Sequence, residues 1–543
     1  MTPLKVGLLV DGVLADKYAH ELAVWARGRP EIDLSHLIVL RRDPQFKGGS
    51  RSSGVARLLF RLLVATEKMR LKRVGLHGDH FRAFDMSALA VEVIELLPIA
   101  SESGCVHRFR AADLQRLKAL KLDLLIFWGQ GVLRGGILRT SRLGVLAFHH
   151  GHSHVYRGAP PGFWECYYRW PRTGFALQRL TEERGSEVLA RGYFATRRFY
   201  ALNQAELYAK SLAHLKRVLL RAADTKTLPP VEGGREPDSE RLFGAPDAGH
   251  CLAYAGKMLS YGARSRLAAL AGLREQWGIS VLGSGWRSAA FASSRPVVAP
   301  RGRFWSDPFI CRRESRTWCF VEDFVCETGR GRIAVLEING TEAIERGVAL
   351  EEPFHLSFPF LFEHGETLYM CPETAQHSQI RVYRCTEFPL RWQLASVLMD
   401  GVSAVDTLLF ERGGRWWLLT SIDESGTGDH CSELHLFSSD SPLASHWRPH
   451  PRNPVRFDSV GGRNAGLILE GGRIYRVAQC QGFDRYGESL EVREIIEISE
   501  SRYEERRVTR VRPRFRPGLL GTHHLSSDGK TTVIDHMSYF AGG

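Results

Sequence analysis

The feature that most constrains the fold of this chain is a hairpin pattern that recurs in its C-terminal half. Each copy has two short, aromatic-rich strands of period-two hydrophobicity, separated by a glycine-containing or charged turn. If Pro308, Pro359, Thr407 and Ala465 are equivalent, successive copies are 51, 48 and 58 residues apart. Such spacing is typical of a four-stranded propeller blade, and the repeat favours a propeller over the alternative β-sandwich.

The repeat units are expected to begin near residues 307, 358, 406, 464 and 522, and five such units fit residues 251–543. The last unit ends too soon after its second strand to form a whole blade. An isolated strand, Trp277–Leu282, precedes the first repeat and is expected to supply the missing outer strand and close the ring. The sequence therefore predicts an all-β five-bladed β-propeller.

The first 215 residues have a different pattern, in which strand-like and helix-like segments alternate. Buried strands are expected at Lys5–Val10, Leu122–Phe127 and Gly144–His149, with a helix over Tyr18–Ala26. This alternation predicts an α/β domain with a Rossmann-like parallel sheet. Residues 216–250 are rich in proline, glycine and charge and are interpreted as a linker, so the chain is expected to be multidomain.

Composition excludes several classes of protein. Apolar residues make up 44% of the 543 residues and charged ones 24%, which is typical of a globular chain and not of a disordered or collagen-like one. The net charge of +13 suggests contact with phosphate groups or acidic glycans, although nucleic acid is not expected as a partner. No signal-peptide pattern or long apolar stretch is found, so a cytoplasmic location is predicted. The sequence does not indicate an oligomeric state.

A histidine-rich segment follows the third of these strands. His149, His150, His152 and His154 lie within six residues, but no nearby cysteine or carboxylate completes a coordination set, so no metal site is predicted. The ten cysteines are scattered without a CxxC pair and are expected to be reduced.

The same segment ends in Tyr156-Arg157-Gly158-Ala159-Pro160-Pro161, which resembles the Tyr-Arg-Gly-x-x-Pro loop of the formyltransferase family. The strand and turn at Leu124–Leu133 and the strand Thr173–Gln178 also fall where that family would place them, so the resemblance covers about residues 1–215. It implies a formyltransferase-like α/β domain, 10-formyltetrahydrofolate as cofactor, and His149 as an acid/base residue.

The chain departs from this family at two catalytic positions. Ala147 stands where the family has asparagine, and Gly185 lies where its aspartate is expected, so neither can polarise a carbonyl or relay a proton. The cofactor is therefore left undetermined, and the domain is interpreted as re-tasked. His150, Tyr156 and Arg157 are then predicted to bind substrate, Arg157 as an anion ligand.

Acidic residues of the propeller are expected to converge because the first strand of each blade lines the central channel. Asp307 and Asp406 open two blades, and Glu322 and Glu373 lie at matching ends of second strands. A pair of carboxyl groups can perform glycosyl chemistry as acid and base or nucleophile, and Asp307 with Glu322 is the predicted catalytic pair. Glu373 and Asp406 are predicted to bind substrate, as are three further residues of the channel: Arg463, Tyr486 and His523.

Two families resemble this region. The opening Ser306-Asp307-Pro308-Phe309 is similar to that of five-bladed glycosidases of the arabinanase type. The closer resemblance, over about residues 300–540, is to the N-terminal region of plant glucosamine inositolphosphorylceramide transferases. It rests on Asp307-Pro308-Phe309, Phe358–His364, Arg463–Gly466, Gln479 and Arg485-Tyr486-Gly487. This resemblance implies a glycan or glycolipid context.

The function predicted from these features is a transferase in the synthesis or tailoring of surface polysaccharide or glycolipid, acting on an anionic sugar or nucleotide sugar that is free or lipid-linked. The alternatives are a folate-dependent sugar N-formyltransferase, a propeller glycosidase and a non-catalytic glycan-binding or scaffold protein. A basic helix expected over residues 55–74 is either a peripheral membrane contact or a helix that packs its leucines on the domain.

Overall fold

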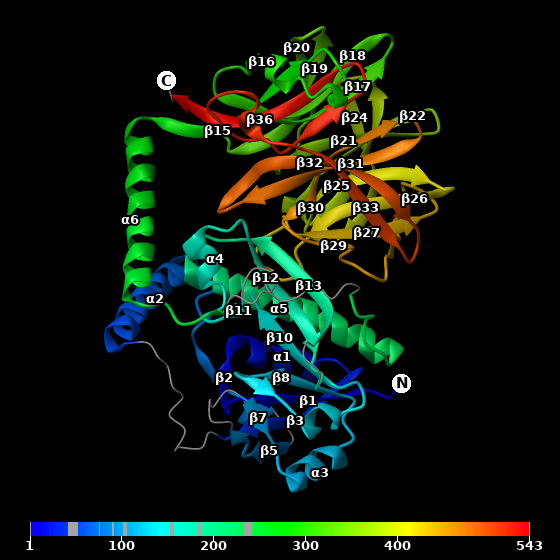
Figure 1. Cartoon of the computed structure of the whole chain (residues 1–543). Helices are drawn as coiled ribbons and strands as arrows, with labels where there is room; N and C mark the ends of the chain where they lie inside the picture. Colours follow the sequence, from blue (N-terminus) through cyan, green and yellow to red (C-terminus); the bar gives the residue numbers. More distant parts are fainter. Residues whose placement is uncertain are drawn as a thin grey trace. The chain divides into compact units, whose positions relative to one another are not determined.

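The computed structural model describes residues 2–41, 53–74, 77–89, 92–100, 106–151, 157–182, 186–232 and 242–541. The chain forms two compact units (Figure 1). Residues 1–259 with 424–427 form the α/β unit, and residues 260–423 with 428–543 form the propeller. No helix in the described part of the chain is long and apolar enough to cross a membrane.

The α/β unit is built on a seven-stranded sheet in which five strands are parallel. The strand order is β13-β12-β10-β8-β1-β3-β5, and only β12 and β13 run antiparallel to their neighbours. The bounds are β1 (Leu4–Val10), β3 (Ile32–Leu40), β5 (Glu92–Leu96), β8 (Leu124–Trp128), β10 (Val145–His150), β12 (Arg172–Arg179) and β13 (Glu187–Ala195).

Helices cover both faces of this sheet because the interior strand β1 is apolar on both sides. Leu8 of β1 packs with α1 (Lys17–Arg27) and α5 (Tyr200–Thr225), whereas Leu9 packs on the other face with α3 (Ala111–Ala119). This arrangement confirms the predicted α/β class. The finer likeness to formyltransferases stays a prediction.

Two helices lie beside α4 (Phe163–Tyr168) and α5 in this unit. They are α2 (Gly54–Val74), at the residues predicted to be helical, and α6 (Ala248–Leu270). The predicted linker 216–250 is too long at both ends, since α5 continues to Thr225 and α6 begins at Ala248. Short strands complete the unit: β2 (Leu14–Asp16), β4 (Ala83–Asp85), β6 (Ile99–Ala100), β7 (Val106–Arg108), β9 (Val132–Leu133), β11 (Arg157–Gly158) and β14 (Leu242–Phe243).

The second unit is the predicted five-bladed propeller. Four blades are consecutive in sequence. They are β17 (Arg303–Arg313), β18 (Arg316–Val325), β19 (Arg330–Asn339) and β20 (Glu342–Leu350); β21 (Ser357–His364), β22 (Thr367–Glu373), β23 (Gln379–Glu387) and β24 (Arg391–Asp400); β25 (Ala404–Arg412), β26 (Arg415–Ile422), β27 (Glu433–Ser439), β28 (Arg448–Pro449) and β29 (Arg456–Phe457); and β30 (Val460–Glu470), β31 (Arg473–Gly482), β32 (Arg485–Ile498) and β33 (Tyr503–Val511).

The fifth blade joins the two ends of the propeller sequence. It combines β34 (Leu519–Gly521), β35 (Leu525–Ser527) and β36 (Thr532–Ala541) with β15 (Leu273–Leu282) and β16 (Arg295–Val297). Strand β15 pairs antiparallel with β36 along its whole length, from Leu273 opposite Ala541 to Leu282 opposite Thr532. The expectation that a strand before the first repeat closes the ring is confirmed, and closure removes the exposed edge of β36.

Candidate functional site

The innermost strands of three blades share a left-handed bulge. Asp307, Phe358 and Asp406 occupy equivalent positions in β17, β21 and β25, with φ of 48°, 47° and 51°. At each position the pairing with the second strand shifts register. Such a bulge re-aims a side chain and costs conformational energy for a residue other than glycine, so it is common at binding sites. Two of the three residues at this bulge, Asp307 and Asp406, are the acidic residues predicted to open blades.

Asp406 is held by an arginine from the neighbouring blade. Arg463 Nε lies 2.5 Å from Asp406 Oδ2, and its Nη2 lies 3.3 Å from Glu373 Oε2. Gln479 Nε2 also donates to Asp406 Oδ2, at 3.1 Å. One guanidinium therefore joins two of the predicted carboxyls, and burial together with the charge of Asp406 raises the pKa of Glu373 well above its ordinary value.

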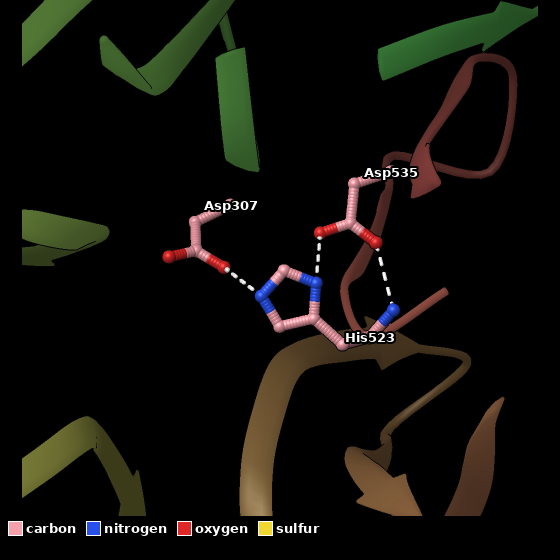
Figure 2. Close-up of side chains that lie close together, drawn as sticks. All are labelled: Asp307, His523 and Asp535. Carbon is pink, nitrogen blue, oxygen red and sulfur yellow. Dashed lines mark hydrogen bonds and ion pairs between the residues drawn. The ribbon is translucent and has the colours of Figure 1, made fainter. Parts of the chain in front are cut away.

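Asp307 belongs to a second cluster, shown in Figure 2. The His523 ring lies between two carboxyl groups, with Nδ1 2.6 Å from Asp535 Oδ2 and Nε2 3.3 Å from Asp307 Oδ1. Asp535 is fixed in turn, since its Oδ1 accepts the backbone N–H groups of His523 and His524 at 2.8 and 2.9 Å. Asp535 thus orients the imidazole, and the imidazole faces Asp307.

These contacts set the charges of the cluster. Burial alone would lower the pKa of His523, but the carboxylates of Asp535 and Asp307 outweigh it and raise that pKa to about 9. Burial raises the pKa of Asp307 to about 7, although His523 opposes the shift. His523 is therefore an imidazolium at neutral pH, and Asp307 exchanges its proton in the physiological range.

Glu322 lies on β18 opposite Ser306, the residue before Asp307. Its Oε2 accepts the Ser306 hydroxyl at 2.6 Å, and its Oε1 lies 3.5 Å from His355 Nε2. Burial and the nearby charge of Asp307 raise the pKa of Glu322 to about 8. Glu322 and Asp307 are therefore an interacting pair of buried carboxyls that retains a proton near neutral pH. This is the arrangement expected of an acid and a base.

Aromatic side chains border the same cluster. The Trp277 ring lies 3.9 Å from that of His523, and the Tyr486 ring lies 5.3 Å from it. The Arg463 guanidinium is 5.3 Å from the Tyr486 ring centre. Gly487 has φ of 60°, and a Cβ there would lie 2.7 Å from His523 Cβ, so this close packing requires glycine.

Ligand atoms of Asp307, His523 and Asp535 lie within 4.8 Å of one another, a spacing that a metal ion fits. Both nitrogens of His523 already face carboxylate oxygens, however, and a metal ligand must offer a nitrogen lone pair. We therefore interpret the cluster as a protonated histidine between two carboxyls.

The other predicted site residues lie in the α/β unit. His149 and His150 end β10, where the parallel strands present their carboxyl ends. His150 Nε2 lies 3.1 Å from Ser211 Oγ, the ring is tilted against that of Tyr208 at 4.4 Å, and burial lowers its pKa to about 3. It packs against α5 as a neutral ring. Arg157 begins β11, whereas Tyr156 and the Arg157 side chain lie outside the described residues.

The folate cofactor implied by the formyltransferase resemblance does not fit the described residues. Ala147 lies within β10, paired in register with Phe127 and Gln178, and its methyl group offers no hydrogen bond to a formyl oxygen. Gly185, at the expected aspartate position, lies outside the described residues. We therefore derive no formyl-transfer step.

Two residues of the channel cluster were missed by sequence reasoning. Asp535 lies on β36 opposite His523 and His524, and its role depends on the backbone N–H groups that it accepts from them and on the His523 ring. The Glu322 and Glu373 positions correspond to His536 on β36, so alignment of the repeats does not point to Asp535. Trp277 was noticed only as part of the closing strand, and its place in the cluster depends on ring closure.

The family match from comparison with known proteins lies within the propeller. Residues 289–514 match the model of a family described as glucosamine inositolphosphorylceramide transferase 1, N-terminal. The propeller resembles this N-terminal region. Transferases of that name from Arabidopsis thaliana and Oryza sativa subsp. japonica are 33% identical over 236 residues and 35% identical over 208. These stretches cover 40% and 37% of this chain but only 30% and 27% of the relatives.

Solved structures that resemble part of this chain have lower sequence identity to it. A thermostable family-43 glycoside hydrolase is 17% identical, with a TM-score of 0.34, and the match covers 43% of this chain and 88% of that one. The catalytic domain of the Coprinopsis cinerea GH62 α-L-arabinofuranosidase is 11% identical, with a TM-score of 0.35, and covers 44% and 92%.

The charge of His523 leads to a first prediction. Asp535→Asn removes the larger of its two stabilising charges and leaves Asp307 and the burial in place, so the pKa of His523 should fall from about 9. An NMR titration of the imidazole, assigned with His523→Gln, measures both values. Because the folded pKa is raised, His523 stabilises the wild type fully below pH 6.5, and this contribution is lost as pH rises through about 9.

The exposed Asp440→Asn is the matched control and should leave the His523 titration unchanged. An unchanged pKa in Asp535→Asn would contradict the ion pair of Figure 2.

Proposed function

We propose that the propeller binds a sugar over its carboxyl cluster and transfers a glycosyl group, within the synthesis or tailoring of a glycolipid or surface polysaccharide. The observation that carries this proposal is a pair of buried carboxyl groups at one bulge: Asp307 occupies the bulge, and Glu322 accepts the hydroxyl of the preceding Ser306 at 2.6 Å. Asp307 would accept the proton of the attacking hydroxyl, or attack the sugar itself, and Glu322 would give its proton to the leaving oxygen. The propeller is similar to the N-terminal region of glucosamine inositolphosphorylceramide transferases, and this likeness supports a sugar donor and a lipid-linked acceptor.

The surroundings of the pair also suit a sugar. Buried carboxyl groups accept hydrogen bonds from hydroxyls, and an aromatic ring such as Trp277 or Tyr486 offers an apolar surface to a sugar face. The carboxyl groups of the cluster outnumber its cations: Asp307, Glu322, Glu373, Asp406 and Asp535 against Arg463 and His523. This number of carboxyl oxygens favours a sugar ring with free hydroxyls as the ligand at the cluster.

Ligand binding by the full chain tests this function. Thermal unfolding is followed with nucleotide sugars, free sugars, glycolipid headgroups and folates, and a sugar-bearing ligand is expected to raise the midpoint. Tyr486→Ala removes an exposed ring at the border of the cluster and should weaken that ligand about tenfold. Glu411→Gln, an exposed change on the neighbouring strand β25, should bind as the wild type does.

Two outcomes would count against the proposal. Stabilisation by a folate that is lost in His149→Gln would move the function to the α/β unit and restore sugar formylation. Sugar binding that is equally strong in Tyr486→Ala would place the sugar away from the cluster.

A further inference from the structure

The second helix of the α/β unit has an apolar stripe on each of two faces. One stripe faces the core: Ala56 and Leu71 are buried, and Phe60, Leu63 and Val64 are partly buried. The other is exposed to solvent, where Leu58 and Leu62 keep 59% and 55% of their surface. A helix that only packed its leucines on the domain would need the first stripe alone. The second stripe, Val55, Leu58, Leu62 and Met69, is called the α2 face below.

The charges beside the α2 face are all positive. Arg57, Arg61, Arg70 and Lys72 are exposed on the same helix. Its one acidic residue, Glu67, is buried, where it accepts the Tyr254 hydroxyl at 2.7 Å and the Ala201 N–H at 2.7 Å. The helix therefore exposes no negative charge to solvent, because its one acidic side chain is buried.

The first turns of α6 also expose apolar side chains and have no acidic residue. Tyr254 joins α6 to α2 through Glu67, and Figure 1 shows the first turns of α6 close to α2. On the solvent side of these turns, Leu252 and Leu259 are exposed, and α6 contains no acidic residue. The nearest one, Asp247, precedes the helix and pairs with His250.

We infer that the α2 face, with the first turns of α6, docks this protein on an anionic membrane surface. An exposed apolar stripe flanked only by lysine and arginine fits the boundary between lipid headgroups and acyl chains, where leucines enter and cations meet lipid phosphates. A second copy of the chain would bring the same positive charge against itself, so the charge pattern favours anionic lipid over self-association. The inference does not depend on the proposed sugar chemistry, since it concerns other residues.

Vesicle sedimentation with the full chain tests this inference. We expect binding to vesicles of equal parts phosphatidylcholine and phosphatidylglycerol, little binding to phosphatidylcholine alone, and weaker binding as NaCl rises from about 0.1 M to about 0.5 M. Arg57→Gln with Arg61→Gln should weaken binding to the anionic vesicles about 30-fold. Leu58→Gln with Leu62→Gln should weaken it at least as much, because two exposed leucines would no longer enter the bilayer.

Matched controls lie on the propeller. Arg295→Gln with Arg301→Gln removes two exposed charges, and Leu469→Gln removes an exposed leucine, and both should bind as the wild type does. Because all these positions are exposed, circular dichroism should show the same unfolding midpoint throughout.

Three results would overturn the inference. The first is a folded wild type that does not bind the anionic vesicles. The second is equal loss of binding in the controls, which would mean that net charge alone drives adsorption. The third is a dimer, seen by light scattering, that Leu58→Gln with Leu62→Gln dissociates, since the face would then be a protein interface.

Discussion

Glu505→Gln is expected to destabilise the propeller by about 3 to 5 kcal/mol, because it leaves a buried arginine without its counter-charge. Arg476 has 0% of its surface exposed and donates to both carboxylate oxygens of Glu505, at 2.8 and 2.9 Å. Arg456 and Arg493 approach the same carboxylate at 3.5 and 3.3 Å. Burial alone would raise the pKa of Glu505, but these guanidinium groups bring it down to about 2.

The effect should reach the channel as well as the stability. Arg476 also donates to Asn464 Oδ1 at 3.2 Å, and Asn464 donates to the backbone carbonyl of Asp406 at 2.7 Å. Without the Glu505 charge, the Arg476 guanidinium loses the ion pair that fixes its position. Its hydrogen bond to Asn464, and the bond from Asn464 to the Asp406 carbonyl, should then weaken. We expect weaker binding of any ligand that requires Asp406.

Urea unfolding followed by tryptophan fluorescence measures the stability change. Glu504→Gln is the matched control, since Glu504 is the exposed neighbour on β33, and it should change stability by less than about 0.5 kcal/mol. Because the pKa of Glu505 is depressed, the difference between Glu505→Gln and the wild type should shrink as pH falls toward 2. A loss no larger than that of Glu504→Gln would show that Arg476 needs no counter-charge.

The sequence predicts the propeller well because its signal is local and repeated. Each hairpin carries period-two hydrophobicity and a turn, and one blade length separates successive hairpins, so the number of blades follows without knowledge of distant contacts. Ring closure was also predictable, because strand Trp277–Leu282 had no partner nearby in sequence. The parallel sheet of the α/β unit was predictable from its short apolar runs for the same reason.

The sequence predicts the site less completely, because the site depends on contacts across the ring. Asp307 and Glu322 could be proposed from their places in a repeat. That His523 lies between Asp307 and Asp535 depends on blade five meeting blade one, and that Arg463 pairs with Asp406 depends on contact between two blades. The start of α6 was missed for a different reason: Ala248–Leu270 is rich in alanine and glycine and has no clear buried stripe.

Glu322→Gln and Asp307→Asn are each expected to lower the rate of glycosyl transfer by about 10²- to 10⁴-fold, the usual contribution of a positioned acid or base. This prediction rests on the proposed function. In Glu322→Gln the new amide would accept the Ser306 hydroxyl but could not give a proton to the leaving oxygen, and in Asp307→Asn the new amide could not take one from the acceptor. Both changes preserve size and leave Trp277 and Tyr486 in place, so sugar binding should be weakened far less than turnover.

The pH dependence of the wild type gives an independent readout. Asp307 must lose its proton to act as base, so the rate should rise as pH passes about 7, and Glu322 must keep its proton to act as acid, so the rate should fall above about 8. Because the two groups interact, these limits belong to the pair, and the expected profile is a narrow bell. In Glu322→Gln the residual rate should lose its alkaline limb, since no acid remains to be deprotonated.

Release of labelled sugar to a lipid acceptor and to water, measured with the donor that stabilises the protein, distinguishes transfer from hydrolysis. Glu411→Gln serves again as the control and should keep the wild-type rate. Added formate or azide separates the two roles open to Asp307. If Asp307 is a nucleophile, a small anion should restore turnover to Asp307→Gly by attacking the sugar in its place, and a sugar–anion adduct should form. If Asp307 is a base, the anion should restore turnover by taking the proton of the acceptor, and no such adduct should form. If both Glu322→Gln and Asp307→Asn kept nearly full turnover with an unchanged bell, the reaction would lie elsewhere, and the propeller would be a binding module.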